Sequence, residues 1–184
     1  MKKALIIINP RAGMQQANAV FVDMMSIFNR QGYIPCVMAT EKHGDATEYA
    51  STYGGNYDMV VAIGGDGTLN EVIDGFLAAG LDIPIGYIPA GSTNDFGSSL
   101  GIPKNLLTAA RDIVTGVPTP MDIGKFNDRY FSYVASFGAF TQTSYTAPQD
   151  MKNLLGHTAY ILEGIKDIPS IRPWSLRLKN EVGI

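Results

Sequence analysis

The stretch MVVAIGGDGTLNEVIDGF, residues 59–76, joins a short apolar run to a helical pattern through a glycine-rich turn. Met59–Ile63 is rich in β-branched residues and contains no polar side chain, which predicts a strand buried on both faces. Thr68–Ala79 carries apolar side chains at helical spacing, which predicts an amphipathic helix. A buried strand that turns into a helix is typical of a parallel sheet, because parallel strands need a crossover between them.

Further strands and helices alternate on both sides of this unit. Strands are expected over Ala4–Ile8, Tyr33–Met38 and Ile83–Ile88. Helices are expected over Ala19–Arg30, Ala46–Tyr53 and Leu106–Val114. This alternation predicts an α/β domain over residues 1–120, in which helices cover both faces of a parallel sheet.

The pattern of residues changes near residues 118–120, where two prolines flank a threonine. Residues 121–126 and 130–136 are expected to form two strands, joined by a tight turn at Asn127-Asp128. We predict that they open a β-rich second domain over residues 121–184.

This second domain is expected to be incomplete. A helix is predicted around residues 157–166 and an alternating, half-buried strand over residues 174–178. The chain ends soon after that strand, and a hairpin that does not return leaves an unpaired edge, which proteins normally avoid. A second copy of the chain can pair with such an edge, so a homodimer is a further expectation.

Each strand of the predicted parallel sheet ends in a loop of small or polar residues. The four loops begin at Asn9, Thr40, Gly64 and Pro89. The carboxyl ends of parallel strands meet at one edge of a sheet, where open α/β sheets bind their ligands. Four such loops at one edge predict a bound phosphate ester.

The loop Gly64-Gly65-Asp66-Gly67-Thr68 carries the most chemical information. Its glycines allow a ligand to approach the backbone closely, and successive N–H groups can surround an anion. The helix that follows directs the positive end of its dipole to the same place. A carboxylate such as Asp66 is unusual beside phosphates unless a cation lies between them, which predicts an indirect Mg²⁺ contact.

A simple turn is the alternative interpretation of this loop. Thr68 and Glu71 fit a capping box, with Thr68 as the N-cap and Glu71 three residues into the helix. In that case Glu71 would be a cap and not a ligand. A cap does not require three glycines and an aspartate before it, so phosphate binding is favoured.

A second loop, Gly86–Ser92, has the glycine spacing of a Walker A loop. Ser92 stands where the lysine of that motif would be, so the loop is not a P-loop. Ser92 to Asp95 permits another capping box, in which one hydroxyl is structural. We predict that this loop makes a second contact with a phosphate or a ribose.

Composition narrows the possible classes of protein. The 184 residues are 46% hydrophobic and 17% charged, which is a globular balance, and the net charge of −3 gives no field that would recruit nucleic acid.

Cys36 is the only cysteine, which excludes an internal disulfide and fits a reducing cytoplasm. His43 and His157 belong to no metal-ligand or triad pattern. No apolar run is long enough for a transmembrane segment, so we expect a cytoplasmic protein, peripheral at the inner membrane face at most.

Taken together, these motifs resemble the diacylglycerol kinase catalytic-domain family, which includes bacterial lipid kinases and sphingosine kinases. The matching pieces are Asn9-Pro10 with Gly13, Thr40 ahead of Gly44-Asp45-Ala46, Gly64–Val72, Pro89–Phe96 and Leu100–Pro103. The combination is specific, although the GGDGT element alone is shared with NAD kinases and phosphofructokinases.

The resemblance implies a Rossmann-like nucleotide-binding domain of the NAD kinase and diacylglycerol kinase type, with ATP and Mg²⁺ as cofactors. It further implies transfer of the γ-phosphoryl group to a lipid acceptor at a membrane surface. The residues it assigns to the nucleotide are Asn9, Gly13, Thr40, Gly65, Asp66, Gly67, Thr68, Leu69, Asn70, Glu71 and Ser92, with Asp66 acting through nucleotide-bound Mg²⁺.

The family's general base and its further Mg²⁺-binding carboxylates match no residue of this chain, and we expect them beyond residue 184. The chain by itself is therefore expected to bind nucleotide with little or no transfer. Two alternatives stay open: an NAD kinase-like enzyme that uses the same glycine loop, and a non-catalytic nucleotide-binding module.

Overall fold

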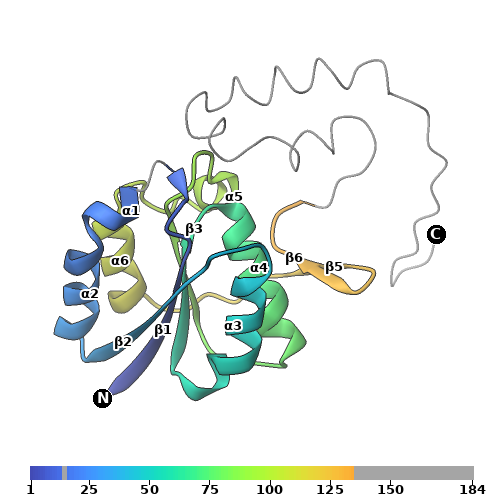
Figure 1. Ribbon diagram of the computed structural model, residues 1–184, viewed down its shortest axis with the longest axis horizontal. Helices are drawn as coiled ribbons and strands as arrows, with labels where there is room; N and C mark the ends of the chain where they lie inside the picture. The colour runs from blue at the N-terminus through green and yellow to red at the C-terminus, as the bar shows by residue number, and fades with distance from the viewer. Residues whose placement is uncertain (14–15, 135–184) are drawn as a thin grey trace, which may run out of the picture. The chain divides into compact units, whose positions relative to one another are not determined.

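Four parallel strands form the centre of the structure, a computed structural model that describes residues 1–13 and 16–134 (Figure 1). The sheet order is β2-β1-β3-β4, and every pairing is parallel, as the sequence predicts. The strands are β1 Lys2–Ile8, β2 Tyr33–Ala39, β3 Met59–Gly64 and β4 Ile85–Pro89. The two central strands, β1 and β3, are buried over most of their length, which explains their uninterrupted apolar sequences.

Prolines limit where β4 can begin and where β2 can lie in the sheet. β4 starts at Ile85 and not at the predicted Ile83, because Pro84 has no N–H for the ladder and only its carbonyl takes part, accepting from Val60 N at 3.1 Å. Pro35 lies inside β2, which is tolerated because β2 is an edge strand.

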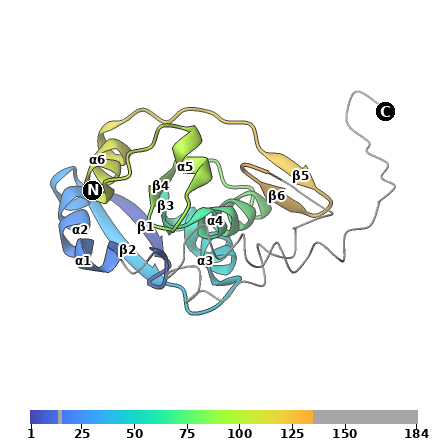
Figure 2. The same ribbon diagram turned by 90° about the horizontal axis from the view of Figure 1, so that it is seen from above.

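Helices cover both faces of the sheet (Figures 1 and 2). They are α1 Gln16–Ala19, α2 Phe21–Arg30, α3 Asp45–Tyr53, the 3-10 turn η2 Gly54–Asn56, α4 Asp66–Ala78, α5 Asp95–Ser99 and α6 Leu106–Thr115. The helix predicted over Ala19–Arg30 is interrupted at Val20, and the short α5 was not predicted. Within the described residues no helix combines the length and the apolar character needed to cross a bilayer.

The alternation of side chains along β1 divides the core into two layers. Ala4, Ile6 and Ile8 pack with residues of α2 and α6, including Phe28. Leu5 and Ile7 face the opposite way and join residues of α3 and α4. Helices therefore pack against both faces of the sheet, and α4, which follows the glycine loop, lies on one of them.

The helix after the glycine loop begins earlier than the capping box predicts. α4 starts at Asp66 with Gly65 as its N-cap, and Leu69 N donates to Gly65 O at 3.1 Å as the first helical bond. The prediction that Thr68 is the N-cap is therefore wrong. Thr68 lies inside the helix and is buried, and Glu71 is more than one turn from the start.

Beyond α6 the chain forms a small antiparallel hairpin of β5 Gly124–Phe126 and β6 Arg129–Phe131, which confirms the predicted turn at residues 127–128. Both strands are shorter than predicted. The hairpin lies against α4, where Tyr130 N donates to Asp74 Oδ1 at 3.0 Å (Figure 2).

The described residues all belong to one compact unit, Met1–Ala135. The second domain over residues 121–184 stays a prediction. The helix predicted around residues 157–166, the strand over 174–178 and the edge expected to pair in a homodimer lie outside the described residues.

Candidate functional site

Three of the four loops are in backbone contact at the carboxyl edge of the sheet. Gly13 has a φ of +48°, and a Cβ at this position would lie 2.1 Å from the carbonyl oxygen of Ala90. A Cβ on Gly91 would lie 2.4 Å from the Cα of Gly65. Ala90 N also donates to Gly64 O at 2.8 Å. The glycines are therefore needed first of all to bring the loops after β1, β3 and β4 together.

The loop after β3 directs the amino end of α4 to this edge. The helix has 13 residues, and its N-cap, Gly65, provides no side-chain cap. The N–H groups of a helix's first turn have no partner inside the helix, and the helix dipole makes this end attractive to anions. The site therefore combines a backbone donor set with a close approach from two neighbouring loops, as phosphate binding requires.

Gly67 is the one glycine of the described residues that has neither a positive φ nor an atom within 4 Å of a Cβ placed on it. It lies exposed in the first turn of α4. Glycine at a helical position costs roughly 1 kcal/mol relative to alanine. Neither folding nor packing explains why this position has no side chain, whereas a ligand lying close to the backbone would.

Asp66 binds backbone amides of another element. Its Oδ2 accepts from Asp95 N at 3.0 Å and its Oδ1 accepts from Phe96 N at 3.1 Å. The carboxylate therefore satisfies the first N–H groups of α5, from 29 and 30 residues away in the sequence. Sequence analysis missed this role, because only the folded sheet brings the two loops together.

Glu71 connects α4 to the loop between β2 and α3. Its Oε2 accepts from Gly44 N at 3.0 Å, and its Oε1 is hydrogen-bonded to His43 Nδ1. The main-chain oxygen of Glu71 accepts from the Thr47 hydroxyl at 3.0 Å. The expectation that Glu71 caps its own helix is therefore wrong, since its acceptors serve a segment 24 to 28 residues earlier.

Within the β2–α3 loop, Asp45 closes the turn. Its Oδ2 accepts from Glu41 N at 2.8 Å and from Lys42 N at 2.9 Å, and its side chain is buried. These amides, with Lys42 first and Glu41 second, hold the pKa of the Asp45 carboxyl below its usual value. The N-cap of α3 is Gly44, with a φ of +92°.

The loop after β4 is held by Asn94 and not by a serine or threonine. Asn94 is in the left-handed region at φ 56°, its Oδ1 accepts from Gly91 N at 2.9 Å, and its Nδ2 donates to Gly91 O at 2.7 Å. The expected capping box from Ser92 to Asp95 does not form. Within the described part of the chain, the hydroxyls of Ser92 and Thr93 have no hydrogen-bond partner and are available to a ligand.

Tyr87 supports this loop from the core. Its hydroxyl donates to Asn94 Oδ1 at 3.3 Å, and its side chain is only 6% exposed. Burial, and then the negative charge of Asp66, raise the pKa of Tyr87. The phenol therefore stays protonated at any ordinary pH and serves as a donor.

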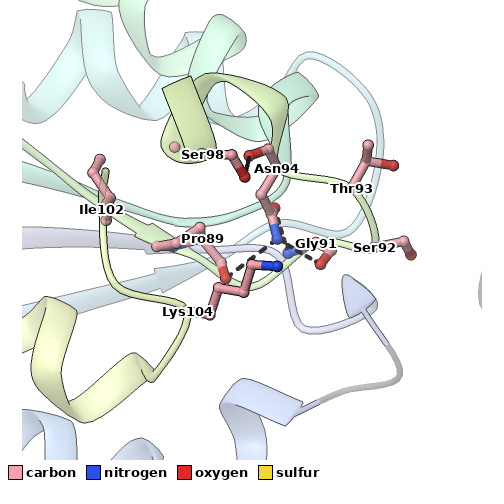
Figure 3. Close-up of a pocket in the computed structure, with 9 residues that line it drawn as sticks. Pro89, Gly91, Ser92, Thr93, Asn94, Ser98, Ile102 and Lys104 are labelled. Carbon is pink, nitrogen blue, oxygen red and sulfur yellow. Dashed lines mark hydrogen bonds between the residues drawn. The ribbon is translucent and has the colours of Figure 1, made fainter. Parts of the chain in front are cut away.

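A shallow hollow of about 210 Å³ lies beside the same loop. Its walls are formed by Pro89, Gly91, Ser92, Thr93, Asn94, Gly97, Ser98, Ile102 and Lys104. Figure 3 shows the Asn94 side chain turned back toward Gly91 and Pro89, whereas the side chains of Ser92 and Thr93 point away from them. The hollow is smaller than the ~300–1,000 Å³ typical of ligand pockets.

The other residues assigned to the nucleotide differ in where the fold places them, and Asn70 is half-buried on α4. Asn9 Nδ2 donates to the Thr68 hydroxyl at 3.4 Å, and Gly13 and Gly65 belong to the contact described above. Thr40 directly follows β2, and its N–H donates to Ile8 O at 2.9 Å, which places it next to the end of β1. Leu69 is different, because its side chain is 2% exposed in the core and cannot face a ligand.

Comparison of the sequence with known proteins identifies a family and several relatives. Residues 3–126 match the family described as diacylglycerol kinase catalytic domain. A diacylglycerol kinase of Staphylococcus aureus (strain bovine RF122 / ET3-1) is 40% identical over 179 residues, covering 97% of this chain and 57% of that protein. A diacylglycerol kinase of Bacillus subtilis (strain 168) is 38% identical over 181 residues, covering 97% and 60%.

Solved structures show the same likeness. The crystal structure of a diacylglycerol kinase from Bacillus anthracis str. Sterne superimposes with a TM-score of 0.65 at 30% sequence identity, covering 71% of this chain and 45% of that one. The chain thus spans 57% to 60% of the length of the two curated relatives named above.

Proposed function

The chain belongs to the diacylglycerol kinase catalytic-domain family, and from that premise we propose that the whole protein is an ATP-dependent lipid kinase. It transfers the γ-phosphoryl group of ATP to a lipid hydroxyl such as that of diacylglycerol. Because the chain spans only 57% of its S. aureus relative, the activity is proposed for the whole protein and the nucleotide site for this chain.

The observation that carries the proposal is the amino end of α4, with the β4 loop packed against the glycines before it and the β1 loop packed against the β4 loop. Backbone N–H groups at this end can bind phosphate oxygens without any lysine. Gly67 leaves room for them, and the hydroxyl of Ser92, which has no hydrogen-bond partner among the described residues, adds a side-chain donor. Phosphoryl transfer depends mainly on such positioning and on charge stabilisation.

Mg²⁺ fits this site as an ion held mostly by the nucleotide. Within the described residues, no group of three or more His, Cys, Asp or Glu side chains could form a metal cage. Each oxygen of Asp66 accepts one amide and keeps a second lone pair. Asp66 can therefore supply one ligand, directly or through water, to a Mg²⁺ that would neutralise charge on the phosphates.

The direct test is transfer of radiolabelled phosphate from the γ position of Mg-ATP to diacylglycerol vesicles by the whole protein. Labelled lipid is expected. The same protein with NAD and ATP tests the NAD kinase-like alternative, which would label NAD instead. Nucleotide binding without labelling of either acceptor would favour the non-catalytic module. The 184-residue chain, assayed in parallel, is expected to bind ATP.

Gly67→Ala tests the role of the loop in the whole protein. Alanine has open space at this position, so the free energy of unfolding should rise by up to about 1 kcal/mol. The methyl group would occupy the place of the phosphate, so the Kd for ATP, measured by calorimetry, should rise about tenfold, which corresponds to about 1.4 kcal/mol.

A matched control lies at the other end of the same helix. Ala78→Gly lies in the last turn of α4, so it should lower the free energy of unfolding by less than about 1 kcal/mol, and it should leave ATP binding unchanged. A Gly67→Ala protein that binds ATP as tightly as the wild type would contradict the proposed place of the phosphates.

The site of action follows from the acceptor. Diacylglycerol stays in the membrane, so we propose that the protein meets its lipid at the inner face of the membrane from the cytoplasm. Lipid labelling should therefore require vesicles or mixed micelles, and a sedimentation assay with the same vesicles measures the association.

A further inference from the structure

One carboxylate fastens the β2–α3 loop to α4. Glu71 accepts the amide of Gly44 with one oxygen and pairs with the imidazole of His43 through the other. The Glu71 side chain is 14% exposed, whereas that of His43 is 79% exposed. A side chain at the surface thus reaches inward to hold a largely buried acceptor.

Within the described residues, the hydrogen bonds from the loop itself to α4 both go to the Glu71 carboxylate, and the next one along the chain is from the Thr47 hydroxyl of α3 to the Glu71 main-chain oxygen. Asp45 closes the turn internally, through the amides of Glu41 and Lys42. Gly44 is in the left-handed region, and its N–H finds its acceptor in Glu71 and not within the loop. The packing of α3 against α4 places the end of the loop near the helix. The Glu71 carboxylate then fastens His43 and Gly44, the last loop residues before α3, to α4.

His43 determines the orientation of the Glu71 carboxylate. A glutamate side chain has three rotatable torsions, and one hydrogen bond to Gly44 leaves it free to turn about that oxygen. The imidazole engages the second oxygen, so that the carboxylate is held at both ends. Within the described residues, Oε1 of Glu71 has no other partner than His43.

Glu71 and the loop both lie at the proposed nucleotide site. Glu71 is five residues after Asp66, less than one and a half turns along α4. The loop begins at Thr40, directly after β2, at the same edge of the sheet as Asn9 and Thr68. Movement of the loop relative to α4 would therefore displace two of the proposed nucleotide contacts, Thr40 and Glu71, relative to each other.

We propose that His43 is a positioning residue of the nucleotide site, which acts through Glu71 to hold the β2–α3 loop against α4. This inference rests on the proposed function. An ordinary surface ion pair is worth little, and its removal would leave both the loop and the affinity for ATP unchanged. The pair with His43 differs because the carboxylate is largely buried and also carries a backbone amide.

Two variants of His43 separate these possibilities in the whole protein. The side-chain amide nitrogen of asparagine takes nearly the place of the histidine Nδ1, so His43→Asn keeps a donor for Glu71. His43→Ala removes it. We expect the KM for ATP in the lipid-vesicle assay to rise about tenfold in His43→Ala, with kcat within about twofold of the wild type, and to return close to the wild-type value in His43→Asn.

Amide hydrogen exchange without nucleotide tests the same inference independently of activity. Exchange at residues 41–45 should be about tenfold faster in His43→Ala than in the wild type, and close to the wild type in His43→Asn. Unchanged exchange would overturn the positioning of the loop. Faster exchange with an unchanged KM would overturn its role at the nucleotide site.

Failure of the proposed function gives a different result. A wild-type protein that labels no lipid and binds no ATP would overturn that function, and with it the effect on the nucleotide. The exchange measurement would still decide whether His43 holds the loop.

Discussion

The loops after β3 and β4 make the same turn, from a strand into a helix, by opposite means. The helix after β3 has no side-chain cap at its N-cap residue, Gly65, and Asp66 reaches out to the amides of α5. The loop after β4 is closed internally by Asn94, which bonds both the N–H and the C=O of Gly91. One loop supports its neighbour, and the other is supported.

This difference indicates a division of labour at the site. The first loop leads into a helix of 13 residues and leaves the backbone at Gly67 uncovered, so it is suited to bind an anion through main-chain groups. The second leads into a helix of only five residues and offers instead the hydroxyls of Ser92 and Thr93, which have no partner in the part of the chain that the structure describes. Each of the following substitutions alters a contact that holds one of these loops in place.

Gly91→Ala should have the largest effect, because it separates the two loops. The added Cβ would lie 2.4 Å from the Cα of Gly65 and 2.7 Å from Oδ1 of Asn94. Backbone cannot move away as a flexible side chain does, so the free energy of unfolding should fall by about 3 kcal/mol, at the upper end of the cost of overpacking. The Kd for ATP should rise more than tenfold. Denaturant unfolding and calorimetry measure the two effects.

Gly55→Ala is the control for that change. Its Cβ would meet only the end of the Leu81 side chain, at 3.3 Å, far from the loops. Near wild-type stability and ATP affinity are expected. A Gly91→Ala protein that behaves like this control would show that the loops need not touch.

Asp66→Ala removes the support that the first loop gives to the second. The amides of Asp95 and Phe96 would lose their acceptor, which should lower the free energy of unfolding by about 1–3 kcal/mol. Asp66→Asn keeps one acceptor oxygen and should lie between the two. Thermal unfolding without Mg²⁺ or nucleotide is the measurement. Unchanged stability would mean that Asp66 acts only through the metal.

The fold was predictable because its signals are local. Met59–Ile63 and Ala4–Ile8 are apolar runs bounded by turn residues, and each became a central parallel strand. Glycine-rich loops at the ends of parallel strands must meet at one edge, and the contact between Gly65 and Gly91 confirms that expectation for the loops after β3 and β4. Pattern and topology were sufficient to locate the candidate site.

The partners of the polar side chains could not be predicted in the same way. Thr68 and Glu71 have the spacing of a capping box, but Glu71 pairs with His43 and Gly44, which no local pattern indicates. Asp66 likewise bonds amides 29 and 30 residues later. A capping box competes with every acceptor and donor that the fold brings near, and at this edge the tertiary partners prevail.

Asn94 gives a smaller effect, which can be divided into two parts. Asn94→Gly keeps the left-handed backbone at φ 56° and loses the bonds to Gly91, so a loss of about 1 kcal/mol in the free energy of unfolding is expected. Asn94→Ala also places a Cβ in that conformation, which costs roughly 1 kcal/mol more. Equal stabilities of the two variants would show that the backbone conformation changes instead.

Substitution of Asp45 should have the smallest effect on stability at neutral pH. It tests whether a charged side chain that closes its own loop behaves differently from the neutral side chain of Asn94. Amides of Lys42 and Glu41 lower the pKa of Asp45 in the folded protein. A lowered folded pKa means that the carboxylate adds stability above its unfolded pKa of about 3.9, and that this contribution is lost as the pH falls through the folded value. The wild type should therefore be more stable than Asp45→Asn at pH 6, and the gap in melting temperature should narrow below about pH 4. Asn94→Gly should show no such narrowing, because an amide does not titrate in this range. A gap for Asp45→Asn that stays constant from pH 6 to pH 3 would mean that the two amides bind the carboxyl group equally well in its neutral form.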